Sequence, residues 1–259
     1  MSGKNAAVIE RSEDGVVLTV SPEDGGRVAG LRVGGQELLV PGGPDSHPML
    51  WGAFPMVPWA GRVRRGRFAF EGRTYDLPLD LPPHAIHGTG YRRPWDVEPD
   101  GSLAIELDEA WPFGGSAHQR FDLHADHLVW TIEVRASQQS MPAQAGWHPW
   151  FRRPVRLLFM ANAMYELDDE GVPTGTLVPV RPGPWDDCFT HLLGPPQLAW
   201  DDGPTVTIAS SCTDWVVYDK PEHAMCVEPQ TGPPDGFNLA PQVVEPGHPL
   251  VATMTLRWA

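Results

Sequence analysis

The sequence predicts an all-β fold, a sandwich or a barrel of mostly antiparallel strands. Short apolar runs alternate with polar residues at a period of two, and turn-forming pairs separate several of them. No stretch of ten or more residues has a 3.6-residue apolar period with caps at both ends, so we expect few or no helices. Glycine (27) and proline (29) are spread among the apolar runs, as is typical of turns in a folded chain.

The predicted strands occupy residues 15–21, 27–35, 102–107, 119–134, 205–210, 215–219 and 250–258. The pairs Asp14-Gly15, Gly34-Gly35 and Asp100-Gly101 suit tight hairpin turns. Within the longest run, a turn at Ala125-Asp126 predicts that two strands are joined there as a hairpin. No internal repeat or low-complexity linker divides the chain, so we expect a single domain over residues 1–259.

The composition excludes several classes of partner. Lys plus Arg number 19 and Asp plus Glu number 33, a net charge of −14, which argues against nucleic acid and anionic membranes. The three cysteines, Cys188, Cys212 and Cys226, are too few and too scattered for a disulfide framework. The N-terminal MSGKNAAVIERSEDG has no apolar core, and no run is long enough to span a membrane. We therefore expect a soluble, cytoplasmic protein.

Polar groups gather beside aromatic residues and rigid turns in five segments that lie far apart in the sequence. Such a mixture is typical of a ligand pocket, in which a few fixed polar groups interrupt an apolar wall. Aromatic faces suit the C–H faces of a sugar ring, while charged and amide groups suit its hydroxyls. The segments are FPMVPWAGRVRRGRF (54–68), HAIHGTGYRRPW (84–95), GWHPWF (146–151), WDDCF (185–189) and CVEPQTGPPDGFN (226–238).

The order of residues across these segments resembles that of the aldose 1-epimerase (galactose mutarotase) family, over roughly residues 15–258. The Glu228 segment is the most specific motif and the His148 segment is next. The resemblance rests on Arg62, His87-Gly88, Trp95, His148, Asp186 and Glu228. It implies a large antiparallel β-sandwich with a long concave face. It also implies an isomerase that interconverts sugar anomers by opening and reclosing the ring, without a cofactor or a metal.

The resemblance assigns a role to each matching residue. It implies that Glu228 is the base for the C1 hydroxyl, that His148 is the acid for the ring oxygen, and that His87 hydrogen-bonds near the reacting oxygens. It further implies that Arg62 and Asp186 hold ring hydroxyls, beside the aromatic faces of Trp95 and Trp150. The partner would be an aldohexose or a related monosaccharide, and the protein a monomer or a homodimer.

Several alternatives stay open at these positions. Asp187 competes with Asp186 for one role, His84 is expected to be structural, and Arg64, Arg65 and Arg67 fit the solvated face of a hairpin. The pairs His84/His87 and His124/His127 could suggest zinc, but neither CxxC nor HExxH is present. Gly88-Thr89-Gly90 lacks the strand–loop–helix setting of a phosphate loop.

Two departures from the family pattern bear on the substrate. Gly61 stands where the best-known members have an asparagine, and Trp150 stands where they commonly have a tyrosine. The missing amide leaves the identity of the sugar open. Two rival functions also remain: an epimerase of hexose 6-phosphates, gripped by the arginines of residues 62–65 and 92–93, and a sugar-binding or regulatory protein without turnover.

Overall fold

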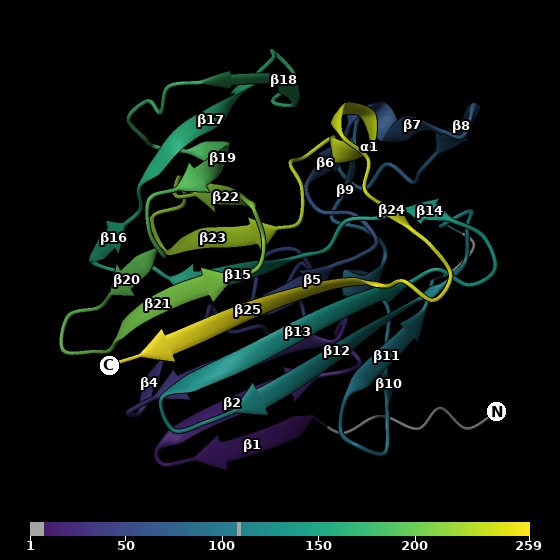
Figure 1. Cartoon of the computed structure of the whole chain (residues 1–259). Helices are drawn as coiled ribbons and strands as arrows, with labels where there is room; N and C mark the ends of the chain where they lie inside the picture. Colours follow the sequence, from purple (N-terminus) through teal and green to yellow (C-terminus); the bar gives the residue numbers. More distant parts are fainter. Residues whose placement is uncertain (1–7, 108–109) are drawn as a thin grey trace.

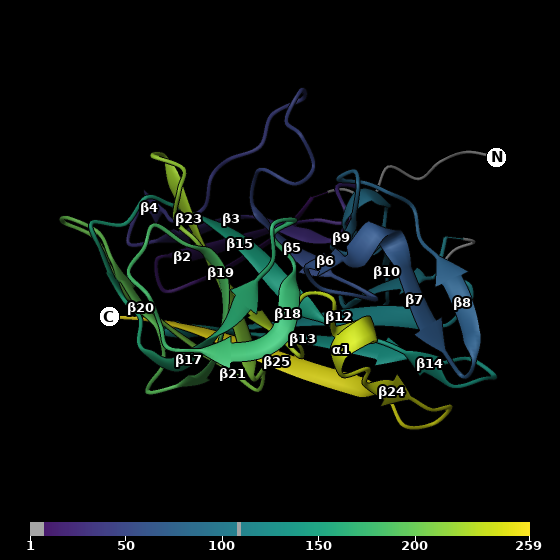
Figure 2. The same cartoon turned by 90° about the horizontal axis from the view of Figure 1, so that it is seen from above.

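The computed structural model describes residues 8–107 and 110–259, and it confirms the all-β prediction and the sandwich. Two large antiparallel sheets form two layers, with β12, β13 and β25 of one sheet in front of β2, β5 and β15 of the other (Figures 1 and 2). The N-terminal segment noted above falls partly in residues 1–7, outside the described residues.

The first sheet has eleven strands in the order β1-β2-β3-β5-β15-β23-β22-β19-β17-β18, with β4 paired to β3. They are β1 (Ile9–Glu13), β2 (Val16–Ser21), β3 (Arg27–Val33), β4 (Gln36–Glu37), β5 (Ala53–Met56), β15 (Gly146–Arg152), β17 (Ala161–Leu167), β18 (Pro173–Val178), β19 (Asp186–Leu192), β22 (Asp214–Tyr218) and β23 (Ala224–Gln230). Strands distant in sequence are neighbours at its centre, where β15 lies between β5 and β23.

The second sheet has eight strands in the order β10-β11-β12-β13-β25-β21-β20-β16. They are β10 (Asp96–Val97), β11 (Leu103–Glu106), β12 (Ser116–Leu123), β13 (His127–Arg135), β16 (Arg156–Leu158), β20 (Gln197–Ala199), β21 (Thr205–Ser210) and β25 (Leu250–Trp258). The predicted runs 205–210 and 250–258 coincide with β21 and β25. The predicted hairpin is β12–β13, and the His124 N–H closes its turn by donating to the His127 carbonyl at 2.8 Å.

Short elements cover one end of the sandwich. They are the pairs β6 (Arg62–Val63) with β9 (Ala85–Ile86), β7 (Arg67–Phe70) with β8 (Arg73–Asp76), and β14 (Met141–Pro142) with β24 (Val243–Val244). The helical elements are η1 (Arg64–Gly66), η2 (Gly90–Arg92) and α1 (Gly236–Leu239), each a single turn. Seen from above, α1 lies near β7 and β18 (Figure 2). The expectation of few or no helices therefore holds for the described residues.

The core lies between the two sheets, and alternation along β15 decides which side chains enter it. Trp147 on β15 packs against Trp130 on β13, with ring centroids 6.0 Å apart. His148 and Trp150 point to the opposite face because successive strand residues alternate. Loops cover that face as well, so residues 146–151 are all buried. A histidine is thereby placed in the interior, which is unusual for a polar residue in a strand.

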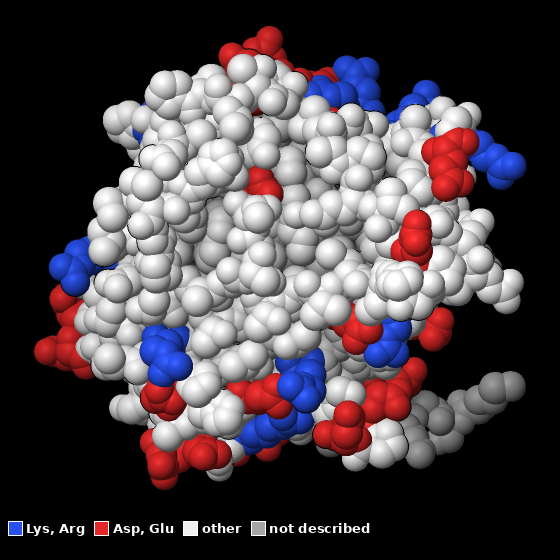
Figure 3. All heavy atoms as spheres, in the orientation of Figure 1, with Lys and Arg blue, Asp and Glu red and all other residues white. Residues whose placement is uncertain are grey.

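The surface carries charges of both signs. Figure 3 shows acidic and basic side chains interspersed along the edges of one face, whose middle carries few of either. Such mixing gives this face no extended field of one sign. None of the helices within residues 8–107 and 110–259 has the length and apolar character needed to cross a membrane.

The segment 84–95 approaches the loop after β5 very closely at Gly88. Gly88 has φ +75°, and a Cβ there would lie 1.9 Å from the Val57 carbonyl oxygen. Gly72, in the β7–β8 turn, has nearly the same φ of +76° but nothing within 4 Å of an added Cβ. The two glycines therefore share a backbone conformation and differ in the space around them.

We expect Gly72→Ala to lower the free energy of unfolding by about 1–2 kcal/mol, the usual penalty of a left-handed conformation. Gly88→Ala should cost at least ~2 kcal/mol more, because the backbone around Val57 must also move. Urea unfolding of the two variants and the wild type measures the difference. Equal losses for both variants would contradict the close approach at Gly88.

Candidate active site

A cavity of about 270 Å³ opens on the face of the first sheet that points away from the second sheet. Its volume lies just below the roughly 300–1,000 Å³ of sites for drug-sized ligands, as suits a monosaccharide. Six of the seven predicted site residues line it: Arg62, His87, His148, Trp150, Asp186 and Glu228. They come from β6, the loop after β9, β15, β19 and β23, so the fold gathers residues spread over more than 160 positions of the sequence.

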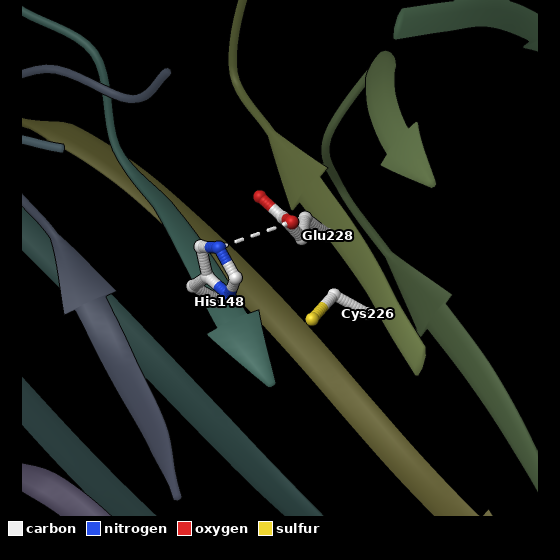
Figure 4. Close-up of side chains that lie close together, drawn as sticks. All are labelled: His148, Cys226 and Glu228. Carbon is white, nitrogen blue, oxygen red and sulfur yellow. Dashed lines mark ion pairs between the residues drawn. The ribbon is translucent and has the colours of Figure 1, made fainter. Parts of the chain in front are cut away.

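His148 and Glu228 meet at the base of the cavity. Strands β15 and β23 pair with Gly146 opposite Gln230 and Trp150 opposite Cys226, a register that sets His148 opposite Glu228. The Nε2 atom of His148 lies 3.3 Å from Oε1 of Glu228 (Figure 4). Exposure is 6% for His148 and 2% for Glu228. A potential acid and a potential base are thus in contact and shielded from bulk water.

Burial shifts both groups toward their neutral forms, because a charged side chain loses its hydration there. The pKa of Glu228 is raised well above its usual range by burial and then by the nearby negative charge of Asp186, while Arg62 and the Gln230 amide oppose the rise. The pKa of His148 is lowered to about 3, mainly by burial and in part by the positive charge of Arg27. Near neutral pH the pair therefore holds one proton between its two groups.

His87 faces His148 edge-on, with ring centroids 4.9 Å apart. Its Nδ1 accepts a hydrogen bond from the Gly61 backbone N–H at 3.3 Å, and the backbone N–H of His87 donates to the Gly61 carbonyl at 3.0 Å. Burial, His148 and Arg62 hold the pKa of His87 well below its usual range, so the ring is neutral. Because Nδ1 accepts, the ring proton sits on Nε2. His87 is therefore a fixed hydrogen-bond donor.

Arg62 and Asp186 lie beside each other in the lining of the cavity. Nη2 of Arg62 lies 3.7 Å from Oδ2 of Asp186, which is also 3.9 Å from Nζ of Lys220. Asp187 instead accepts a hydrogen bond from Arg181 at 2.6 Å. The carboxylate of Asp186 is therefore held more loosely than that of Asp187.

A column of rings holds His148 in place. Phe54 on β5 stacks on His148 with ring centroids 4.7 Å apart, and Trp150 on β15 stacks on His148 with centroids 5.4 Å apart. Beneath Phe54 lies the guanidinium of Arg27, 5.5 Å from the ring centroid. Arg27 is itself buried, and it donates to the backbone carbonyls of Asp24, Trp51 and Tyr91. Near-parallel packing of the two rings against the imidazole restricts its rotation.

Trp95 is not brought into the cavity, and this differs from the role that the resemblance implied. It is buried in the core, and its Nε1 donates to the Gly90 carbonyl at 3.0 Å. Its large ring anchors the loop that carries His87. His84 is also structural, since its Nδ1 accepts from the Arg65 N–H at 3.1 Å.

The sequence did not single out several residues that line the cavity. Gln230 is completely buried and donates to Oε2 of Glu228 at 3.4 Å, while its own Oε1 has no partner among the described residues. The spacing Glu228-x-Gln230 on one strand places both on one face and could have identified it. Leu167, Gly171 and Pro173 form part of the rim, and they carried no recognisable signal.

The backbone conformation and the close approach of Pro234 explain why a glycine stands at position 61. Gly61 has φ +67°, and a Cβ there would lie 2.7 Å from Cγ of Pro234. Pro234 also lines the cavity, so it takes space that a longer side chain at position 61 would need. The cavity has an apolar contact at this point, where the family's asparagine would bring an amide.

Neither histidine pair considered for zinc gains a third ligand within the described residues. The group of potential ligands found there is His148, Cys226 and Glu228. A second cavity, of about 320 Å³, lies beside Arg27, Trp51 and Tyr91, and its lining among the described residues contains no histidine. The contact between His148 and Glu228 therefore distinguishes the cavity at β15 and β23 from this second cavity.

Three proteins of known sequence are similar to this chain. The uncharacterized protein YphB of Escherichia coli K12 is 32% identical over 158 residues, 59% of this chain and 54% of YphB. The uncharacterized protein YihR of the same organism is 26% identical over 280 residues, 92% of this chain and 87% of YihR. Mouse galactose mutarotase is 26% identical over 162 residues, 51% of this chain and 45% of that protein. The chain thus spans about half the length of YphB and of the mouse protein.

Solved structures share the fold at lower identity. A galactose mutarotase-like protein from Clostridium acetobutylicum superposes with a TM-score of 0.87 at 16% identity, covering 97% of this chain and 95% of that one. Galactose 1-epimerase from Lactobacillus acidophilus gives a TM-score of 0.83 at 16% identity, covering 100% and 96%.

The family model described as aldose 1-epimerase matches residues 9–192, well over half of the chain. The matched residues include Arg62, His87, His148 and Asp186 and end before Glu228. The sequence resemblance, the sandwich and this match agree, and the chain belongs to the aldose 1-epimerase family.

Proposed function

We propose that the protein is an aldose 1-epimerase that interconverts the α and β anomers of a neutral aldohexose. The observation that carries this proposal is the 3.3 Å contact between His148 and Glu228 at the base of a monosaccharide-sized cavity. Both oxygens that exchange protons in mutarotation are bonded to C1 of the sugar. An acid and a base that meet on adjacent strands can serve both oxygens at once.

The proposed reaction moves two protons and breaks one bond. The Glu228 carboxylate takes the proton of the C1 hydroxyl, and the electron pair left on O1 forms the aldehyde C=O. The bond between C1 and the ring oxygen breaks, and the ring oxygen takes a proton from the His148 imidazolium. Rotation about C1–C2 followed by the reverse steps gives the other anomer. A positioned acid or base typically contributes about 10²–10⁴-fold.

The other cavity residues would hold the sugar in this position. The fixed Nε2–H of His87 would donate to an oxygen near the reaction centre, and the neighbouring Arg62 and Asp186 would bond ring hydroxyls. Trp150 offers an apolar face to C–H groups. A protein that only binds sugar has no need for an acid and a base in contact, which favours catalysis over the sugar-binding alternative.

Three of the arginines considered for a 6-phosphate, Arg64, Arg65 and Arg92, are already paired with carboxylates. Arg64 lies 2.6 Å from Asp168 and 3.3 Å from Glu170, and Arg65 lies 2.6 Å from Glu170. Arg92 forms an ion pair with Asp80. A phosphate would have to displace these carboxylates, at the expense of existing charge-assisted hydrogen bonds. The pairing favours a neutral substrate.

We expect Glu228→Gln to lower kcat at least ~10²-fold, because an amide keeps the shape but cannot accept the proton. His148→Asn should cause comparable loss, and the double variant should lose much less than the product of the two. Polarimetry of freshly dissolved α-glucose and α-galactose measures turnover, and quenching of tryptophan fluorescence measures binding. Glu222→Gln, an exposed carboxyl on the turn before β23, serves as the control. Near wild-type turnover by Glu228→Gln would show that another group is the base.

The pH dependence follows from treating His148 and Glu228 as one titrating pair. With the pKa of Glu228 raised and that of His148 lowered, the single shared proton resides mainly on Glu228. The reactive form, carboxylate with imidazolium, contains the same number of protons. The acidic limb of the rate profile therefore marks uptake of a second proton, and the alkaline limb marks loss of the only one.

We expect Asp186→Asn to move the alkaline limb of kcat/KM to lower pH, because the negative charge that helps Glu228 retain its proton is removed. Arg62→Met should move the same limb to higher pH, since Arg62 opposes that retention. Both variants should also weaken binding, so the position of the limb is the readout, rather than the rate. The measurement is kcat/KM by polarimetry across pH, corrected for spontaneous mutarotation. Shifts of the same sign in both variants would contradict this electrostatic account.

We expect kcat/KM for glucose 6-phosphate to be no higher than for glucose or galactose. The physical reason is that the nearby guanidinium groups are held by carboxylates. Polarimetry with each sugar measures the ratio, and an Arg64→Ala, Arg65→Ala double variant tests the cause. A tenfold preference for the phosphorylated sugar that disappears in the double variant would establish the rival function.

A further inference from the structure

A cysteine that the proposed reaction does not use lies beside the acid and the base. Cys226 is on β23 two residues before Glu228, so both side chains point to the same face of the strand. The sulfur points toward the His148 ring, and Glu228 reaches the same ring from further along β23 (Figure 4). One ligand atom from each of the three residues lies within 4.8 Å of the other two. All three residues are buried.

We propose that His148, Cys226 and Glu228 form a site for a divalent cation that favours thiolate and imidazole, with Zn²⁺ as the best fit, and that the bound ion inhibits the protein. Thiolate sulfur, imidazole nitrogen and carboxylate oxygen are the ligands that Zn²⁺ prefers. Hard cations such as Mg²⁺ favour an all-oxygen set and are not expected to bind here.

The spacing fits the ion after a small movement. In a tetrahedral site with Zn–N and Zn–O of about 2.0 Å and Zn–S of about 2.3 Å, ligand atoms lie roughly 3.3–3.7 Å apart. The His148–Glu228 pair has this spacing already, at 3.3 Å. The distances from the Cys226 sulfur to the other two ligand atoms must shorten by up to about 1 Å. Rotation of the Cys226 side chain about χ1 can supply this movement.

The site opens toward the substrate cavity, which His148 and Glu228 both line. Three protein ligands leave the fourth tetrahedral position for water or a sugar hydroxyl. An ion held there occupies the lone pairs of the base and of the imidazole, so neither can move a proton. The inhibition therefore rests on the proposed function, whereas the binding itself does not.

The chain supplies matched controls for the thiol. Cys188 lines the same cavity on β19, and Cys212 lies in the core, and neither belongs to the cluster. All three cysteines are free and buried. A thiol effect at the proposed site should therefore follow Cys226 alone.

The experiment uses the full chain after treatment with EDTA and a reducing agent. Co²⁺ is titrated first, since a sulfur-to-cobalt charge-transfer band reports a Cys ligand without any need for activity. Zn²⁺ binding is then measured by calorimetry, and Zn²⁺ inhibition by polarimetry. Each measurement is repeated with Cys226→Ser, Cys226→Ala and Cys188→Ser, and circular dichroism checks the fold of each variant.

We expect one bound ion, a charge-transfer band in the wild type and in Cys188→Ser, and loss of the band in both Cys226 variants. Removal of the sulfur ligand should weaken Zn²⁺ binding at least ~100-fold. Treatment with EDTA should leave turnover unchanged or raise it. Absence of the band, or equal Zn²⁺ affinity in folded Cys226 variants, would overturn the site. A band without any mutarotase activity would leave the site intact and refute the proposed function instead.

Discussion

The active-site architecture depends on one contact, between His148 and Glu228 on two strands that are covered on both faces. The register of β15 and β23 sets the two residues opposite each other, and the second sheet and the covering loops exclude water from them. The exclusion of water raises the pKa of Glu228 and lowers the pKa of His148. The same two side chains on an exposed edge strand would titrate separately and would not share a proton.

The surroundings keep this contact from rearranging. Phe54 and Trp150 both stack on the ring of His148, and the Gln230 amide donates to Oε2 of Glu228. Gly61 fixes both the position and the tautomer of His87 through two backbone bonds. Each restraint reduces the ordering that a bound sugar would otherwise have to bring about.

Most charged side chains around the cavity are paired with a side chain of the opposite charge. Arg64 and Arg65 hold the hairpin between β17 and β18 through Asp168 and Glu170, and this hairpin supplies part of the rim. Arg62, Asp186 and Lys220 remain near the mouth with separations of 3.7–3.9 Å, too long for direct hydrogen bonds. The polar groups left for a ligand are therefore few and of both signs.

The sequence by itself determined the fold class, because strand alternation and turn chemistry are local properties. The runs 205–210 and 250–258 even match β21 and β25 at both ends. Distinctive motifs around His148 and Glu228 also identified residues that line the cavity. Only the tertiary structure decided that Trp95 is an anchor for a loop, that Gln230 supports Glu228 and that Cys226 lies beside His148 and Glu228. Those relations depend on the pairing of distant strands and on which face of each strand is covered, and neither is encoded by neighbouring residues in the chain.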